Sequence, residues 1–435
     1  MSADEFWQRK TKELNFLESY TGSGYQHGPL SDLVSLRQQV SSLRKRLLIR
    51  QAEESAELSE TSTVGPHRYL FSGKPVKYGY QRYDLERVEI DWEGELYYIH
   101  SVGRFTDGLL LSSGMSAVAA LFSTFARRGW TRVQFSPVPY YESQLLATRF
   151  FKSIRCNHAL DGKFSADPDV LWLDTSSLIW PEFPKQIGSI RLLVVDTTCV
   201  EPDSSHIQRW INESERLNCP VILVRSHIKL DSFGMELGRL GSIVISASTD
   251  QSGDAVALMS ELEQARSGFG LGFTLIGLYP WLGDPDFAQL TKQRTAAIRD
   301  VSNILGVALR NARKPSDRFE ILPSITHGLF LIIRTKLDVT SDEDAPREVN
   351  PFAGFILSRK IAESCKRSNL PVLAAASLGL DQLTINDFVN IANGQHEVRI
   401  ASADIPHELL PVIAAHTRDA IGAFTQEYND NRRRL

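Results

Sequence analysis

Two charged residues follow apolar runs of the sequence, at points where their side chains could do chemistry. Asp196 ends the run 192-LLVVD-196, and Lys229 comes three residues after the run 221-VILVRS-226. A carboxylate at the end of a buried strand is costly unless a cation pairs with it or it caps its own loop. A lysine held in a pocket can act as a nucleophile or base, whereas a lysine on a loop is usually solvated.

A turn that opens a helix, 112-SSGMSA-117, is a candidate anion site. The backbone N–H groups of Ser113, Gly114 and Met115 would lie at the positive end of the helix dipole, which suits a phosphate. An ordinary N-cap is the alternative. Late in the chain, Arg399 in 397-EVRIASA-403 has a guanidinium that would pair with a carboxylate through two hydrogen bonds. A surface arginine is the alternative there.

The order of these features along the chain favours one chemistry. A phosphate-binding helix start, an aromatic residue, a strand-end Asp196, Lys229 with Ser226 before it, and a late Arg399 are the parts that pyridoxal 5′-phosphate (PLP) chemistry requires. The lysine would bind the cofactor covalently, the aspartate would keep the ring nitrogen protonated, and the arginine would hold an amino-acid substrate.

The elements around these residues indicate an α/β domain. From about residue 105 to 250, apolar runs alternate with helical segments such as 204–218, and the runs are 132–138, 170–176, 191–198, 220–226 and 242–248. Continuous apolar strands joined by helices predict a mostly parallel sheet that is covered on both faces. Ligands bind at the carboxyl ends of such strands, where the candidate residues fall.

The two ends of the chain differ from this central part. The spacing of Leu33, Leu36, Val40, Leu43 and Leu47 predicts an amphipathic helix over 31–51, capped by Ser31 or Asp32, either packed on a neighbouring surface or serving as an oligomerisation arm. The polar segment 52–66 is typical of a linker. The end of the chain predicts a smaller α+β domain, with helices over 287–309, 351–367 and 406–424 and strands over 328–335 and 397–403. We therefore expect an N-terminal arm and linker (1–70), a large PLP-binding domain (71–285) and a small C-terminal domain (286–435).

Composition excludes several other classes of protein. The 435 residues are 42% hydrophobic and carry a net charge of −4, which argues against binding to nucleic acid or to a membrane surface. The four cysteines have no metal-ligand spacing, so we expect no metal site. Cys199 and Cys219 lie near apolar runs and are expected to be buried thiols. No apolar run reaches the length of a membrane span and the first residues are charged, so we expect a cytoplasmic protein.

The motifs also resemble one family, the fold-type-I PLP enzymes of cysteine and methionine metabolism, which include cystathionine γ-synthase and methionine γ-lyase. The resemblance runs from about residue 78 to 403. In this sequence 112-SSGMSA-117 is similar to the family's SSGMAA, 140-YYES-143 to YGGT, 195-VDTT-198 to VDNT, 226-SHIK-229 to SxTK, 377-SLG-379 to SLGG, 398-VRIAS-402 to LRLSVG, and 80-YQRYD-84 to YSRYGNPT.

The resemblance implies a role for each matching position. Lys229 would carry the cofactor and move protons, together with Tyr140, which would stack on the cofactor ring. Asp196 would pair with the ring nitrogen. The remaining cofactor contacts would come from Ser113, Gly114, Met115, Thr198 and Ser226, with Tyr80 and Arg82 reaching the phosphate of a neighbouring subunit. Arg399 and Ser377 would bind the substrate. Shared sites of this kind imply a homodimer or homotetramer.

Several positions depart from the family's pattern. Ile228 replaces the threonine before the lysine, Tyr141-Glu142 replaces two glycines, and the glycine after the lysine comes one place late, at Gly234. The asparagine that contacts the cofactor's phenolic oxygen has no clear match, and Thr175, Ser176 or Ser177 would substitute for it.

These departures indicate a divergent member of the family in specialised metabolism. We expect an enzyme that acts on an amino acid with a γ-leaving group, by γ-elimination or γ-replacement through a vinylglycine-type intermediate. A PLP-dependent β-lyase or aminotransferase, and a catalytically degenerate scaffold subunit, are the alternatives.

Overall fold

The computed structural model describes most of the chain. The described residues are 3–22, 26–30, 32–61, 67–71, 74–78, 87–88, 96–97, 99, 103–159, 162–177, 180–186, 188–311, 319–323, 327–335, 353–376, 378, 381–390 and 395–432.

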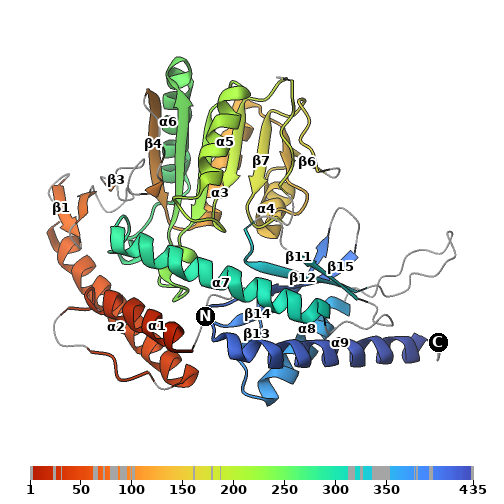
Figure 1. Cartoon of the computed structure of the whole chain (residues 1–435). Coiled ribbons are helices and arrows are strands. Elements are labelled where there is room, and N and C mark those ends of the chain that lie inside the picture. Colours follow the sequence, from red (N-terminus) through yellow and green to blue (C-terminus); the bar gives the residue numbers. More distant parts are fainter. Residues whose placement is uncertain are drawn as a thin grey trace. The chain divides into compact units, whose positions relative to one another are not determined.

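A seven-stranded sheet forms the centre of the larger part of the described chain (Figure 1), in the order β4-β10-β9-β8-β7-β5-β6. Its strands are β4 (Arg104–Leu111), β5 (Arg132–Phe135), β6 (Arg155–His158), β7 (Val170–Asp174), β8 (Leu192–Asp196), β9 (Val221–Ser226) and β10 (Gly241–Ser248). β10 runs antiparallel to both of its neighbours, and the other pairs are parallel. The mostly parallel sheet expected from the apolar runs is therefore confirmed.

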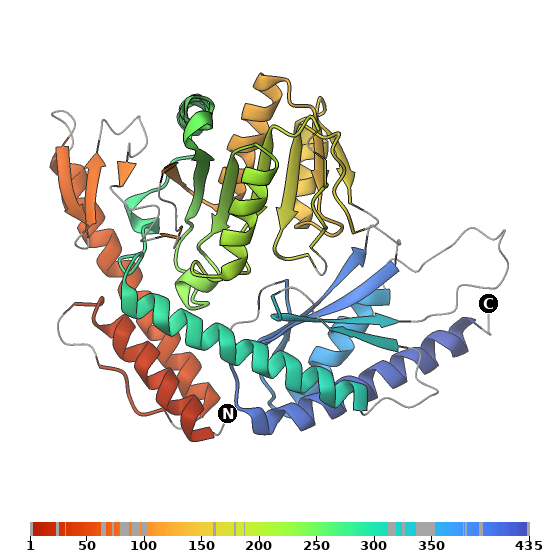
Figure 2. The same cartoon turned by 45° about the horizontal axis from the view of Figure 1, so that its top comes forward.

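Helices cover both faces of this sheet, which explains why its central strands are apolar throughout. Every residue of β7 and β8 is buried. The helices are α3 (Gly114–Arg128), α4 (Tyr141–Phe150), α5 (Ser205–Arg216) and α6 (Ser252–Gly268). α3 packs on β9 and β10, and α6 on β4 and β10. α5 packs on β8, β9 and β10, and Figure 2 shows it in front of the sheet with α3 behind.

A second, five-stranded sheet has the order β11-β12-β15-β14-β13. Its strands are β11 (Phe319–Pro323), β12 (Phe330–Thr335), β13 (Val372–Ala374), β14 (Leu383–Asn390) and β15 (Gln395–Ala401), and the pairs are antiparallel except β13 with β14. The helices α8 (Ala353–Arg367) and α9 (Leu410–Arg432) pack on each other, and α8 packs on the sheet. The expected smaller α+β fold is confirmed.

The N-terminal residues form two helices, α1 (Ala3–Glu18) and α2 (Leu33–Thr61), followed by a small antiparallel sheet of β1 (His67–Phe71), β2 (Lys74–Tyr78) and β3 (Arg87–Val88). As expected, Asp32 caps α2: its Oδ1 accepts the N–H groups of Val34 and Ser35 at 2.9 and 2.8 Å. Within α2, Leu36, Leu43 and Leu47 are buried.

The linker expected over 52–66 is wrong for residues 52–61, because α2 continues through them. Ala52, Glu53 and Glu54 favour a helix, and no glycine or proline interrupts the chain before Gly65. The remaining residues of that segment, 62–66, lie outside the described residues.

Two compact units make up the chain, and each has its own core. One comprises Thr11–Lys292, and the other combines Met1–Lys10 with Gln293–Leu435. The division falls inside α1 and inside the long helix α7 (Pro285–Asn311). The expected division into an N-terminal arm and linker (1–70), a large domain (71–285) and a small domain (286–435) stays a prediction.

All four cysteines are free thiols, and Cys199 and Cys219 are buried, as expected from their apolar surroundings. Among the described helices, none combines the length and the apolar character that crossing a membrane requires.

Candidate active site

The start of α3 lies directly against the end of β9. Ser113 is the N-cap of α3, and its Oγ accepts the Ser116 N–H at 3.0 Å. A Cβ built on Gly114 would come within 2.8 Å of the Ser226 Cβ, so only glycine fits here without a shift. The first N–H groups of a helix and the hydroxyls of Ser113 and Ser226 thus gather at one point, which has the chemistry of a phosphate site.

Thr198 links this helix start to the neighbouring strand. Its Oγ1 accepts the backbone N–H of Ser226 at 3.0 Å. Its own backbone N–H donates to Asp196 Oδ1 at 3.0 Å. Asp196 therefore caps its own loop, which was the ordinary structural alternative for this residue. The same bonds place Asp196, Thr198 and Ser226 side by side at the carboxyl ends of β8 and β9.

Asp196 has a second carboxylate beside it. Asp174 ends β7, and it pairs in register with Asp196 at the end of β8. Burial raises the pKa of Asp196, and the Asp174 carboxylate raises it further. The pKa lies at about 7, despite the lowering effects of the Thr198 hydrogen bonds and Arg225. A cationic ligand group next to this carboxyl group would lower its pKa and restore the carboxylate.

Tyr140 is held next to the same pair of carboxylates through its backbone. Its N–H donates to Asp174 Oδ2 at 2.5 Å, immediately before α4 begins. The Tyr140 residue is 44% exposed. A continuous line of contacts therefore runs along the sheet edge from α3 through Ser226, Thr198, Asp196 and Asp174 to Tyr140. Asp174 was missed in the sequence, although 170-VLWLD-174 ends on aspartate as 192-LLVVD-196 does.

Lys229 lies on the loop that follows β9, at the start of the short 3-10 turn Leu230–Ser232. Its Nζ forms an ion pair with Glu236 Oε1 at 2.9 Å, and the two side chains are 24% and 47% exposed. Exposed ion pairs of this kind contribute about 0–1 kcal/mol, so the amine can leave this partner at little cost.

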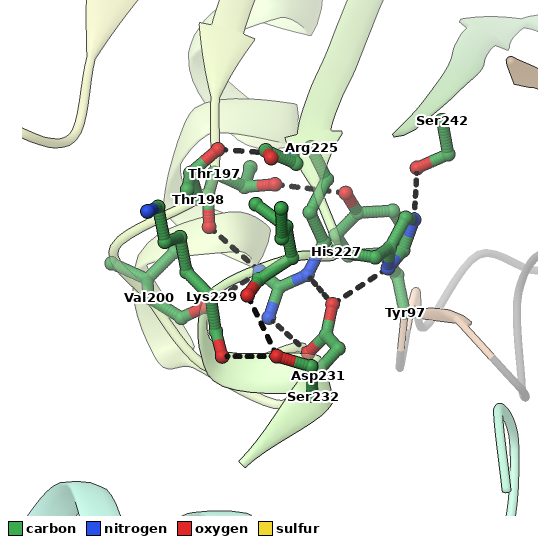
Figure 3. Close-up of polar contacts among 12 residues, drawn as sticks. Tyr97, Thr197, Thr198, Val200, Arg225, His227, Lys229, Asp231, Ser232 and Ser242 are labelled. Carbon is green, nitrogen blue, oxygen red and sulfur yellow. Dashed lines mark hydrogen bonds and ion pairs between the residues drawn. The ribbon is translucent and has the colours of Figure 1, made fainter. Parts of the chain in front are cut away.

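A buried ionic network packs against the loop between β9 and β10 that carries Lys229, which we call the lysine loop (Figure 3). Arg225 is 1% exposed and binds Asp231 through two hydrogen bonds of 2.6 and 2.7 Å. It also donates to the carbonyl oxygens of Thr197 and Val200 at 2.7 Å each. The Trp281 indole N–H donates to the Asp231 carbonyl oxygen at 2.9 Å. The loop is therefore tied to the segment after β8 and to Trp281, which lies shortly before α7.

Sequence reasoning missed this network. Its signal was an arginine inside the apolar run 221-VILVRS-226, because a charge in a buried strand must have a partner nearby. The partner itself, Asp231, depends on how the loop turns back under the strand, which the sequence pattern does not specify.

His227 connects this network to Ser242. Asp231, His227 and Ser242 are linked by hydrogen bonds in the same order as the Asp, His and Ser of a hydrolase triad. His227 Nδ1 lies 2.6 Å from Asp231 Oδ2, and its Nε2 lies 2.9 Å from Ser242 Oγ. Burial lowers the pKa of His227, so the ring is neutral at pH 7, donates to Asp231 and accepts from Ser242. His227 and Ser242 are both 0% exposed, so no substrate reaches this hydroxyl and the arrangement serves the structure.

Four of the predicted site residues belong to the other unit or lie outside the described residues. Arg399 lies on β15 in the other unit, where its guanidinium stacks 4.6 Å from the Phe330 ring centroid and its Nε donates to Asn386 Oδ1 at 3.0 Å. Tyr80, Arg82 and Ser377 lie outside the described residues.

Of the three substitutes proposed for the asparagine, two hydroxyls bond inside the protein. Thr175 Oγ1 accepts the Cys199 N–H at 3.1 Å, and Ser177 Oγ donates to the Val138 carbonyl oxygen at 2.6 Å. Ser176 is partly exposed beside them, and its N–H donates to Asp174 Oδ1 at 2.8 Å. A contact to the cofactor from this segment would therefore come most easily from Ser176.

Comparisons with known proteins support the fold. No family model matches the sequence, and the search of curated proteins gave no match. Among solved structures, the chain is similar to cystathionine gamma synthase from Xanthomonas oryzae pv. oryzae, determined in complex with aminoacrylate and cysteine. The TM-score is 0.50 with 13% identity, over 73% of this chain and 82% of that one. It is also similar to metB from Corynebacterium glutamicum, with a TM-score of 0.47 and 14% identity over 72% and 80% of the two chains. The chain thus shares the fold of the Xanthomonas enzyme at low sequence identity.

Proposed function

We propose that this protein is a PLP-dependent enzyme that acts on an amino acid with a γ-leaving group, by γ-elimination or γ-replacement. The observation that carries the proposal is the line of contacts from the start of α3 through Ser226 and Thr198 to Asp196. It joins a site suited to a phosphate with a buried carboxyl group suited to a protonated ring nitrogen.

The residues present fit the cofactor at both of these ends. Ser113, Gly114, Met115 and Ser226 would hold the phosphate, because the α3 start supplies N–H donors and the dipole favours an anion. Asp196 would accept a hydrogen bond from the protonated ring nitrogen. The partly exposed Tyr140 would stack on the cofactor ring. When bound, PLP supplies an electron sink that stabilises negative charge at the substrate's Cα.

Lys229 would both bind the cofactor and transfer protons. Its weak, exposed pair with Glu236 leaves the amine available, and the loop below it is fixed by Arg225 and Asp231. In the proposed reaction, the Lys229 amine would take the proton from Cα, and Lys229 or Tyr140 would take the proton from Cβ as the group on Cγ departs with its bonding electrons.

Two further parts of the proposal come from the family resemblance. Arg399 would anchor the substrate carboxylate, with Ser377 nearby in the sequence motif. Tyr80 and Arg82 would bind the phosphate of a neighbouring subunit, which makes a homodimer or homotetramer the active form. These roles stay predictions.

A spectroscopic experiment tests cofactor binding. The purified protein is incubated with PLP, freed of excess and scanned at about 400–430 nm, where lysine-bound PLP absorbs. The wild type is expected to show the band, and Lys229→Ala is expected to lose it. Lys292→Ala is the control, because Lys292 pairs with Asp203 at 2.7 Å and its side chain is 66% exposed. Absence of the band in the wild type would contradict the proposal and leave the scaffold alternative.

A product screen separates the reactions that use the same lysine. Homoserine esters, S-adenosylmethionine and γ-halogenated amino acids are offered with and without a thiol nucleophile. γ-Chemistry predicts a 2-oxo acid without the nucleophile or a replacement product with it. Turnover of β-substituted amino acids alone would favour the β-lyase, and amino-group transfer to an added 2-oxo acid would favour the aminotransferase.

A further inference from the structure

The loop after Lys229 contains two strained residues that are not glycine. Phe233 has φ 49° and Glu236 has φ 49°, both in the left-handed region. This conformation costs on the order of 1–2 kcal/mol for a residue with a side chain, and it persists only where the surroundings fix it. Both residues lie within seven positions of Lys229, so whatever fixes them also constrains the lysine.

Phe233 is fixed by aromatic contacts with the N-terminal helix α1 and with the start of α7. It is 2% exposed, and its ring meets the edge of Phe16 at 6.2 Å and of Phe287 at 4.9 Å between centroids. In the turn after this helix, Tyr20 meets Trp281 at 5.7 Å between ring centroids, and Trp281 donates to the Asp231 carbonyl oxygen of the loop. Helix α1 thus contacts the loop directly at Phe233, and the turn after α1 contacts it through Trp281 at Asp231.

Glu236 is fixed by the second N-terminal helix, α2. Its backbone carbonyl oxygen accepts from Arg44 Nη2 at 3.1 Å. Its backbone N–H donates to Ser232 Oγ at 3.2 Å, within the loop. Its carboxylate is the partner of Lys229. Each of the two strained residues is therefore contacted by a different N-terminal helix, and all of these residues belong to the same compact unit.

We propose that the helices α1, from Thr11 on, and α2 act as an intramolecular brace for the lysine loop, with Phe16 and Arg44 as positioning residues for Lys229. The inference rests on the proposed function only in so far as Lys229 binds PLP. It assigns to the arm a role inside its own chain. Loss of a brace contact would let the loop relax at Phe233 or Glu236 and would spread the positions that the Lys229 amine samples.

Hydrogen exchange of the cofactor-free protein tests the brace without PLP. Arg44→Ala removes one hydrogen bond at an exposed position, so the protein is expected to keep its fold. The amides of residues 230–238 are expected to exchange about two- to tenfold faster, because one hydrogen bond contributes about 0.5–1.5 kcal/mol. Amides of β7 and β8 are expected to be unchanged. Arg44→Lys, which retains a donor, is expected to restore protection in part.

Phe16→Ala tests the aromatic contact, with Phe6→Ala as the matched control. Phe6 lies on the same helix but belongs to the other unit, where it packs against Trp7. Both substitutions are expected to lower the melting temperature, but only Phe16→Ala is expected to speed exchange in residues 230–238. Phe16→Tyr retains the ring and is expected to preserve protection.

PLP titration provides the second readout. Arg44→Ala and Phe16→Ala are each expected to weaken PLP binding by about two- to tenfold, because each loosens the loop by one contact. Faster loop exchange without any PLP binding in the wild type would support the brace and contradict the proposed function. Unchanged exchange and unchanged PLP affinity in both variants would overturn the brace.

Discussion

The pKa of Asp196 connects the ligand-free protein with the proposed cofactor complex. Its raised pKa means that the folded protein holds a proton which the unfolded chain has already released. Burial causes this shift, and Asp174 adds to it because two neighbouring carboxylates do not readily ionise together. A cation beside Asp196 would reverse the shift. A carboxylate at this position thus lowers the stability of the ligand-free protein near neutral pH, but it would favour binding of a protonated ring.

Replacing Asp196 with Asn is therefore expected to act in opposite directions on stability and on cofactor binding. Between about pH 4 and 7 the folded state binds the extra proton, so the stability of the wild type falls as the pH rises through this window. Asp196→Asn has no carboxyl group to titrate at this position, so its stability should not fall in this way. At pH 8 its free energy of unfolding is expected to exceed that of the wild type by on the order of 2 kcal/mol. Its affinity for PLP is expected to drop about tenfold or more.

Denaturant titrations at pH 4 and pH 8, with PLP titrations of the same samples, measure both effects. The two proteins are expected to differ little in stability at pH 4. Equal pH dependence of stability in the two proteins would show that Asp196 titrates as an ordinary carboxyl group and would contradict this account.

At the scale of elements, the site depends on how closely β9, β10 and the start of α3 approach one another. A Cβ on Gly241, at the first position of β10, would overlap the Ser113 backbone, just as one on Gly114 would overlap Ser226. The apolar runs of 191–198, 220–226 and 242–248 predicted these strands, and 112-SSGMSA-117 predicted the helix start. The contacts between them involve residues far apart in the sequence, so no local pattern could show that Gly241 supports Ser113.

Other elements were not predicted because their patterns are weak. Helix α6 presents small and polar residues around Leu258 and Leu262, and α1 alternates charged and apolar residues without a glycine or proline boundary. The sequence therefore predicted the strands that carry Asp196 and Ser226, but it did not predict the α1 helix that contacts the lysine loop.

Gly241→Ala is expected to destabilise the protein by about 1–3 kcal/mol, because the added methyl group meets fixed backbone. Gly253→Ala is the matched control. A Cβ there would meet no atom within 4 Å, and the residue lies in the first turn of α6, so a gain of up to about 1 kcal/mol is expected. Chemical denaturation of both variants measures the difference. An alanine at 241 that is tolerated as well as one at 253 would contradict the close approach of β10 to α3.

At the scale of the molecule, each of the two units has its own buried ionic anchor. In the larger unit it is the Arg225–Asp231 pair under the lysine loop. In the other, Asp404 is fully buried and pairs with Arg9 and with Lys10, the latter at 2.8 Å. Removal of one partner from a buried pair leaves an uncompensated charge. The first anchor joins residues six positions apart, whereas the second makes its unit depend on residues from both ends of the chain.

Asp404→Asn is expected to destabilise the protein by on the order of 3 kcal/mol, because Lys10, only 2% exposed, loses its nearest anion. Burial acts to raise the pKa of Asp404, but Lys10, Arg9 and Arg294 outweigh it and hold the pKa below its usual range. The stabilisation is therefore present above about pH 4 and is lost as the pH falls through the lowered pKa.

Melting temperatures from pH 2 to 7 test this expectation. Asp404→Asn should melt lower than the wild type near neutral pH and approach it in acid. Asp419→Asn, which removes a carboxylate paired with Arg418 at the surface, should match the wild type throughout. A wild-type stability that does not depend on Asp404 at pH 7 would contradict the role of this anchor.

Covalent attachment of PLP to Lys229 is the central claim, and reductive labelling tests it most directly. The protein is incubated with PLP, treated with borohydride, digested and analysed by mass spectrometry, with Lys229→Ala and Lys292→Ala in parallel. We expect the phosphopyridoxyl group on the peptide that contains Lys229 in the wild type and in Lys292→Ala, and no stoichiometric label in Lys229→Ala. A wild-type protein that takes up no label, or one labelled at other lysines while Lys229 stays unmodified, would contradict the account.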